Sequence, residues 1–305
     1  MILTSTGINE EIRRNPAGYV HAVDDAYSAQ LCGIAKHIFD RRDSCPIILI
    51  SGPSGSGKTT TAKMIEQFLD GWGCETHTVS MDNYFLPFSP QEMELVNQGK
   101  IDLESPARLD IPLLNSHIVK MINMEPVELP MYDFANSRRL TDRTLTRRPG
   151  ELVILEGIHA LNPAVITVPD TQTCRIYVSV RTRIQTDGLI LHPEKIRLLR
   201  RMLRDRKNRG RSIADTLSMY DNVQLGENRY IMPYKHRRTF DVDTFIAYEA
   251  GVYKQFLMDE LEKEKHDPRI ADLVETLEHL DPVDAACVPE TSLIREFIGG
   301  GQFGL

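Results

Sequence analysis

Short apolar runs alternate with longer segments of helical periodicity over most of this 305-residue chain. The runs are rich in β-branched residues and lie at 46–50, 76–81, 151–157, 175–180 and 242–247. A short apolar run of this kind is typical of a strand buried on both faces of a parallel sheet. Because strands that alternate with helices form βαβ units, the pattern predicts an α/β fold with a five-stranded parallel sheet flanked by helices.

A long insertion, residues 82–150, separates the second and third predicted strands. It is rich in proline and charged residues, and its stretches 127–134 and around Leu140 can pair as a hairpin. Insertions of this length in a compact α/β unit are more often functional than idle. We therefore expect the insertion to contribute to a binding site.

Composition argues against several classes of protein. The chain is 41% hydrophobic and 26% charged, and its net charge of −7 gives no reason to expect a nucleic-acid-binding protein. No apolar stretch reaches the length of a membrane span, and the N-terminus lacks the apolar run of a secretory signal. Five dispersed cysteines without metal-site spacing are typical of reduced thiols. These features predict a cytoplasmic protein without nucleic-acid or membrane partners.

Residues 52–59 read GPSGSGKT, which fits the phosphate-binding pattern G-x-x-x-x-G-K-[ST] between a predicted strand and a helix predicted at 58–70. Glycines let backbone N–H groups surround phosphate oxygens, and the helix adds the positive end of its dipole. Lys58 can reach the β- and γ-phosphates, and the Thr59 hydroxyl can bind Mg²⁺. The predicted nucleotide-binding residues are Gly52, Ser54, Gly55, Ser56, Gly57, Lys58, Thr59 and Thr60.

Two carboxylates follow neighbouring predicted strands. Asp82 lies just past the second strand and Glu156 lies at the end of the third, so both should reach the ligand-binding edge of a parallel sheet. We expect Asp82 to act as a base and Glu156 to bind Mg²⁺ or water. The alternatives are a turn cap for Asp82 and a carboxylate satisfied by the backbone for Glu156.

A basic helix is predicted at about 196–208 and ends at Gly210. Arg201 and Arg204 are three residues apart on one face, where they can cover a triphosphate as a lid and offset charge on the transferred phosphoryl group. A solvated basic face is the alternative interpretation. We expect Arg204 to act together with Lys58 and Asp82 in catalysis.

Five segments, SGPSGSGKTT, SMDNYF, ELPMYDF, VILEGIHAL and RRMLRDRKNRGR, occur in the order found in the uridine kinase and phosphoribulokinase family of P-loop kinases. The chain resembles this family from about residue 46 to residue 248. The segment VPETSLIREFIGG, residues 288–300, is similar to the tail of bacterial uridine kinase-like nucleoside kinases.

The resemblance implies roles for individual residues. Asp82 would accept the proton of the acceptor hydroxyl, and Glu104 would bind ribose hydroxyls. The resemblance also implies substrate contacts by Tyr132, Phe134, Arg139, Arg201, Arg209 and Arg211. Two positions depart from the family: Ser137 stands where it has a base-contacting histidine, and Met219 where it has a pyrimidine-reading glutamine.

Together these features predict an ATP- and Mg²⁺-dependent kinase for a hydroxyl group of a small metabolite, most simply a nucleoside, with a homo-oligomer possible. Alternatives are a kinase for another acceptor, such as a sugar phosphate held by extra arginines of the insertion, and an ATP-binding regulatory protein. A GTPase is less favoured because the guanine-reading N-K-x-D motif is absent from the sequence.

The predicted organisation has three parts. Residues 1–45 form an N-terminal helical extension, residues 46–250 a P-loop kinase domain, and residues 251–305 a C-terminal helical segment and tail. Within the kinase domain, residues 82–150 form the acceptor-binding insertion and residues 196–211 the lid.

Overall fold

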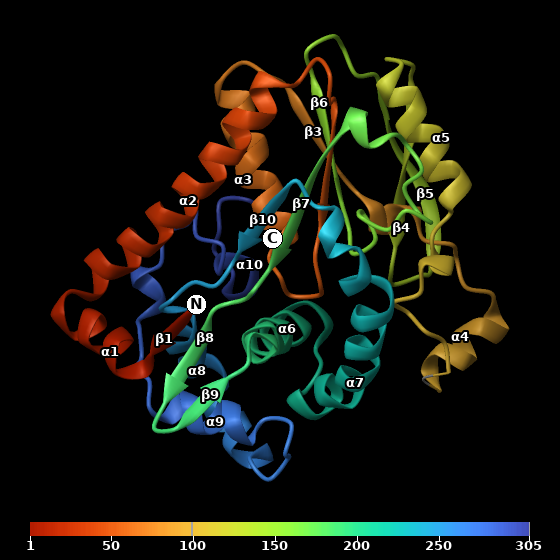
Figure 1. Ribbon diagram of the computed structural model, residues 1–305. Helices are drawn as coiled ribbons and strands as arrows, with labels where there is room; N and C mark the ends of the chain where they lie inside the picture. Colours follow the sequence, from red (N-terminus) through yellow and green to blue (C-terminus); the bar gives the residue numbers. More distant parts are fainter. Residues whose placement is uncertain (99, 305) are drawn as a thin grey trace.

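The computed structural model describes residues 1–98 and 100–304. Its central sheet is parallel throughout and runs in the order β10 (Phe240–Asp243), β7 (Thr173–Ser179), β2 (Ile47–Ser51), β6 (Leu152–Glu156) and β3 (Thr76–Ser80). This confirms the predicted α/β fold and its five-stranded parallel sheet. Of the five strands of this sheet, β2 comes first in the chain and lies at the centre, between β7 and β6, so the loop that follows it is flanked by other strand ends (Figure 1).

Alternate residues of the central strands face two separate cores, as the pleat of a strand requires. Ile48 and Ile50 point toward one core, which includes Leu31 and Ile65 from the helices α2 (Pro16–Asp40) and α3 (Lys58–Gly71). Ile47 and Leu49 face the second core, together with α5 (Ile111–Ile122). Burial on both faces explains why these strands read as continuous apolar runs.

The insertion contains more regular structure than the sequence predicted. The expected hairpin forms from β4 (Val127–Asp133) and β5 (Arg138–Leu145), which pair antiparallel with an irregularity at Leu129/Pro130. Two helices that the pattern did not predict, α4 (Pro90–Asn97) and α5, precede it. Packing of α5 and β4 against the second core holds the insertion beside the sheet.

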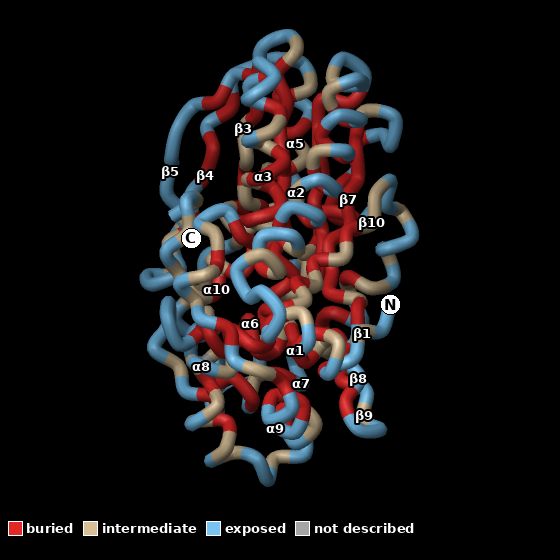
Figure 2. Tube along the Cα trace, turned by 90° about the vertical axis from the view of Figure 1, so that its left-hand side faces the viewer, coloured by how far each residue is buried: buried red, intermediate tan, exposed pale blue. Residues whose placement is uncertain are grey.

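The chain ends pack against the sheet domain. Strand β1 (Ile2–Thr4) pairs with β8 (Arg183–Thr186), which pairs with β9 (Leu189–Leu191), and α1 (Ser5–Arg14) follows β1. Figure 2 shows the buried trace continuing from the sheet into the helices around it. These helices are α6 (Pro193–Arg209), α7 (Ile213–Tyr230), α8 (Glu249–Leu261), α9 (Ala271–Glu278) and α10 (Arg295–Ile298).

The prediction placed the last strand too far toward the C-terminus. The sequence predicted 242–247, but β10 ends at Asp243 and the apolar residues after it form a buried loop that leads into α8. Thr244 explains the change, because its hydroxyl donates to the carbonyl of Ser56 and its own carbonyl accepts from Arg200. Among the described residues, no helix is long and apolar enough to cross a membrane.

Candidate active site

The segment 52–59 forms a tight loop between β2 and α3, in the strand–loop–helix context that the pattern required. Gly55 and Gly57 have φ values of 71° and 81°, which only glycine adopts without strain. A Cβ atom on Gly52 would lie 1.9 Å from the carbonyl oxygen of Val178, so the loop passes too close to β7 for any side chain there. The backbone N–H groups at the start of α3 are thereby directed into one anion-binding position.

Ser54 is the point where helix α6 contacts this loop. Its hydroxyl oxygen accepts hydrogen bonds from Arg204 Nη2 at 3.0 Å and Arg201 Nη1 at 3.4 Å. Its backbone N–H donates to Glu227 of α7 at 3.1 Å, and the Lys58 ammonium donates to the carbonyl of Pro53 at 3.2 Å. Helix α6 therefore lies directly over the loop, with two of the predicted lid arginines on it.

A buried arginine supports the loop from beneath. Arg200 is fully buried, pairs with Glu249 at 2.7 Å and donates to the carbonyl of Gly55 at 3.2 Å. Beside it, Arg197 binds Glu227 with two hydrogen bonds of 2.7 and 2.9 Å. These ion pairs place α6, α7 and α8 relative to the loop, and no local spacing in the sequence indicated them.

The remaining predicted lid arginines lie around the carboxylate of Asp205. Its carboxylate is fully buried and lies 2.7 Å from Arg209, 3.4 Å from Arg201 and 3.7 Å from Arg211. Arg209 and Arg211 therefore point to Asp205 in this structure, and the carboxylate holds the guanidinium groups together at the end of the lid.

Asp82 and Glu156 meet at the carboxyl edge of the sheet, at the ends of the paired strands β3 and β6. Withdrawal from water raises the pKa of the half-buried Asp82, whereas Lys58 and Arg204 act to lower it. Burial and the neighbouring Asp82 raise the pKa of Glu156, against the opposing effect of Lys58. Two neighbouring carboxylates with raised pKa values indicate a site that is short of positive charge.

The unsatisfied groups of this site fit a nucleotide phosphate and a divalent cation. Among the described residues, the buried Ser56 hydroxyl and Arg204 Nε have no hydrogen-bond partner. Such groups are costly to bury unless a ligand binds them. Asp82, Glu156 and the half-buried Thr59 at the start of α3 supply oxygen ligands, which Mg²⁺ prefers.

Glu104 of the insertion lies beside the same cluster. Burial raises its pKa to about 7, Arg201 and Lys58 oppose the shift, and Glu227 and Asp82 add to it. Helix α7 reaches Glu104 because Gly226 has no side chain: a Cβ atom there would lie 2.4 Å from the Cβ of Glu104.

An aromatic cluster extends from Asp82 along the hairpin. The Tyr132 N–H donates to Asn83, and its ring lies edge-on to Phe85 and Phe134 at 5.8 and 5.0 Å between centroids. Tyr132 is buried, whereas Phe134 is 63% exposed. Arg139, opposite Tyr132 on β5, pairs with Asp110 at 2.8 Å, so its guanidinium is held within the insertion.

The two positions that depart from the family differ in their surroundings. The Ser137 hydroxyl lies 2.9 Å from the Tyr132 hydroxyl and accepts from the backbone N–H of Phe88 at 2.9 Å. Its hydrogen bonds are thus made inside the insertion. Met219 lies half-buried on α7.

His159 is a buried histidine close to Glu104. It is 2% exposed, and neither ring nitrogen has a hydrogen-bond partner of ordinary geometry in the described part of the chain. Burial lowers its pKa to about 4, so the ring is neutral at physiological pH. The ring lies edge-on to Tyr230, whose hydroxyl donates to Asp102.

Comparison with known proteins places this site in a family. The profile of the Phosphoribulokinase / Uridine kinase family matches residues 47–244. A uridine kinase of Lactobacillus helveticus is 32% identical over 192 residues, which cover 62% of this chain and 82% of that protein. A uridine kinase of Staphylococcus carnosus is 33% identical over 193 residues, with the same coverage.

A solved structure supports the fold. The structure of a putative fructose transport system kinase from Silicibacter sp. TM1040 matches with a TM-score of 0.52 and 17% identity, covering 70% of this chain and 98% of that one. The family match extends over most of the chain and includes the phosphate-binding loop, Asp82, Glu156 and helix α6. The chain therefore belongs to the phosphoribulokinase/uridine kinase family of kinases.

Proposed function

We propose that the protein is an ATP- and Mg²⁺-dependent kinase that transfers the γ-phosphate to the 5′-hydroxyl of a nucleoside. The position of Asp82 carries this proposal. A half-buried carboxylate beside Lys58 and Arg204, at the strand edge next to the phosphate-binding loop, suits a base for an acceptor hydroxyl. A protein that only binds ATP has no need of such a group.

In the proposed reaction the acceptor oxygen attacks the γ-phosphorus, its proton passes to the Asp82 carboxylate, and ADP leaves. The raised pKa of Asp82 makes its carboxylate a stronger base than an exposed aspartate. Lys58, Arg201 and Arg204 offset the negative charge on the phosphoryl oxygens. Mg²⁺, bound through Thr59 and Glu156, would supply further neutralisation of the phosphates.

The acceptor end supports a ribose-bearing substrate. Glu104 offers carboxylate oxygens for sugar hydroxyls, and Tyr132 with Phe134 offers aromatic surface for a base. The neutral ring of His159 can donate one hydrogen bond and accept another. Relatives named uridine kinase agree with a nucleoside, although Ser137 and Met219 leave the choice of base open.

A phosphorylated acceptor is less well supported. It would need free cations in the insertion, yet Arg138 pairs with Asp133, Arg139 with Asp110, and Arg143 lies 4.0 Å from Asp142. Arg147 is buried and donates to main-chain carbonyls, including that of Met121. Arg138, Arg139 and Arg147 are therefore already engaged within the insertion, whereas Arg148 is 79% exposed and lies 4.0 Å from Glu151.

ADP release in the presence of Mg²⁺, ATP and a panel of nucleosides and sugar phosphates tests the proposal. We expect at least one nucleoside to raise ADP production well above the rate without acceptor, and Lys58→Ala to abolish the increase. Stimulation by sugar phosphates alone would favour the alternative acceptor class. No stimulation by any acceptor, with ATP still bound, would favour a regulatory protein.

A further inference from the structure

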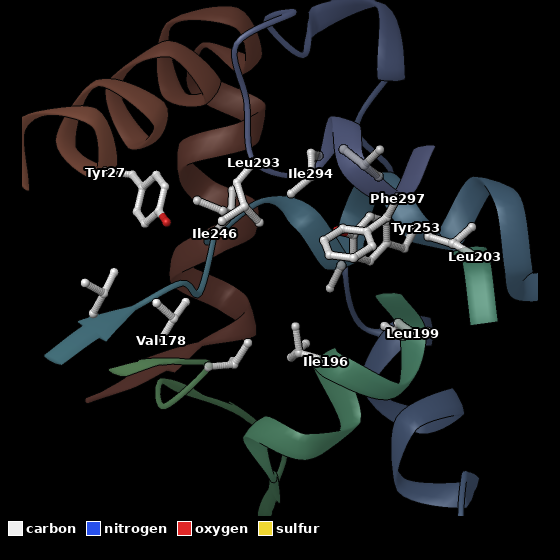
Figure 3. Close-up of a cluster of buried hydrophobic side chains, with 14 of the residues drawn as sticks. Tyr27, Val178, Ile196, Leu199, Leu203, Ile246, Tyr253, Leu293, Ile294 and Phe297 are labelled. Carbon is white, nitrogen blue, oxygen red and sulfur yellow. The ribbon is translucent and has the colours of Figure 1, made fainter. Parts of the chain in front are cut away.

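The C-terminal segment, residues 288–304, lies outside the stretch matched by the family profile but is built into the candidate nucleotide site. Leu293, Ile294 and Phe297 are at most 1% exposed. Figure 3 shows these side chains among apolar residues of other segments, including Ile196, Leu199 and Ile246. Leu293 reaches the loop itself, because a Cβ atom on Gly57 would lie 2.8 Å from its Cδ1.

Polar contacts hold this segment in one position. The Ser292 hydroxyl donates to Asp24 of α2 at 2.7 Å and lies 3.0 Å from the hydroxyl of Tyr248. Arg295 donates to the carbonyls of Ala285 and Gly299 at 3.1 and 3.2 Å and thereby closes the segment on itself. The next residue, Glu296, is consequently presented to α3 from a fixed backbone.

Glu296 binds the start of α3. Its Oε2 accepts a hydrogen bond from the Thr60 hydroxyl at 2.6 Å, and the Thr60 N–H points to the same oxygen at 3.4 Å. Thr60 lies in the first turn of this 14-residue helix, where free N–H groups and the helix dipole attract anions. The carboxylate thus occupies an anion position directly after the phosphate-binding loop.

We propose, on the basis of the kinase function above, that Glu296 is an internal competitor of the donor nucleotide and must leave Thr60 when a nucleotide phosphate binds there. A phosphate oxygen and the carboxylate cannot share one N–H group, and their like charges repel. A small cavity lined by Thr60, Glu296 and Arg295 lies beside the contact.

Equilibrium binding of ADP to the full chain tests this proposal with Glu296→Gln, Glu296→Ala and the control Glu290→Gln. Glu290 is an exposed residue of the same segment whose carboxylate makes no contact with α3 among the described residues. We expect the Kd for ADP to fall about tenfold in Glu296→Ala, equivalent to about 1.4 kcal/mol. Glu296→Gln should give a smaller fall, because its amide oxygen still accepts from Thr60 but carries no charge. The control should match the wild type.

Hydrogen exchange provides a second readout that a purely structural role would not alter. ADP should accelerate amide exchange in residues 295–303 of the wild type, because the segment loses its contact with Thr60, and should have less effect in Glu296→Ala. Equal or weaker ADP affinity in both Glu296 variants would overturn the inference alone. Failure of all four proteins to bind ADP would overturn the proposed kinase function as well, which separates the two failures.

Discussion

Three acidic side chains at the candidate site, Asp82, Glu104 and Glu156, all have pKa values raised by withdrawal from water. The positive charge of Lys58 acts to lower each of these pKa values, but all three remain above the values of exposed carboxylates. Carboxylates with raised pKa values cluster at functional sites, where a base or a cation-binding group is needed. The three carboxylates therefore share one electrostatic environment that suits a base or a cation-binding group.

Asp82→Asn tests the base directly. The amide keeps the size of the side chain but cannot accept the hydroxyl proton, so we expect kcat to fall by about 10²- to 10⁴-fold with ATP affinity retained. Steady-state kinetics and ATP titration measure the two effects. Asp25→Asn, at an exposed position of α2, serves as the control and should leave kcat unchanged. Turnover retained in Asp82→Asn would remove Asp82 from this role.

Glu104 makes stability depend on pH. Its pKa rises from 4.5 to about 7 on folding, so between these values the folded chain retains a proton that the unfolded chain has released. The free energy of unfolding therefore decreases as pH rises through this window. Glu104→Gln removes this contribution, and we expect the variant to become more stable relative to the wild type between pH 5 and pH 8. Urea unfolding at pH 5 and pH 8 measures the difference in free energy of unfolding between the variant and the wild type. The same difference at both pH values would contradict this prediction.

The sequence alone could identify some site residues and not others. Asp82 and Glu156 could be found because the first lies just past the end of one recognisable parallel strand and the second at the end of another, and such ends meet at one edge of a sheet. The contacts of Glu227 and Glu296 could not be found, because Glu227 is more than 150 positions from Ser54 of the loop and Glu296 is more than 150 positions from Thr60 of α3. No local pattern relates residues that tertiary packing alone brings together.

At the scale of the element, the arginines of helix α6 are arranged around one buried carboxylate, that of Asp205. Asp205→Asn would leave Arg201, Arg209 and Arg211 without their shared counter-charge. We expect a loss of about 3 kcal/mol in the free energy of unfolding and a lower kcat, because the lid arginines lose their orientation.

A surface ion pair between α6 and α8 provides the matched control for the Asp205→Asn variant. Arg206 and Glu260 are both about 40% exposed, so Glu260→Gln should cost less than about 1 kcal/mol and leave kcat unchanged. Thermal unfolding and steady-state kinetics measure both variants. If Asp205→Asn behaves like Glu260→Gln, the buried carboxylate does not organise the lid.

The elements differ in how well the sequence predicts them. The strands β2 and β6 are apolar on both faces and each is followed directly by a glycine, so their positions follow from the pattern. The pairing of β1 with β8 joins residues about 180 positions apart and leaves no periodic signal in either strand. The loop after β10 has the apolar pattern of a strand because its residues are buried in the core, although they do not pair as a strand.

At the scale of the whole molecule, residues from both chain ends share one core with the sheet. Leu31 of α2, Ile48 of β2 and Phe297 of the C-terminal segment belong to the same buried cluster. The sequence predicted an N-terminal extension and a C-terminal tail, and nothing in their patterns indicated this shared core. We infer that the described chain unfolds as one cooperative unit.

Leu31→Ala tests this inference in the predicted extension. Leu31 is fully buried, so truncation should cost about 2–5 kcal/mol of the free energy of unfolding. Urea unfolding should show a single transition, shifted for tyrosine fluorescence and for circular dichroism alike. Leu225→Ala removes a leucine that is 67% exposed and should change the free energy of unfolding by less than about 0.5 kcal/mol. A separate early transition in Leu31→Ala, with the remaining structure as stable as in the wild type, would show instead that the extension folds independently. In that case the contacts of α2 with the sheet would contribute nothing to the stability of the candidate site.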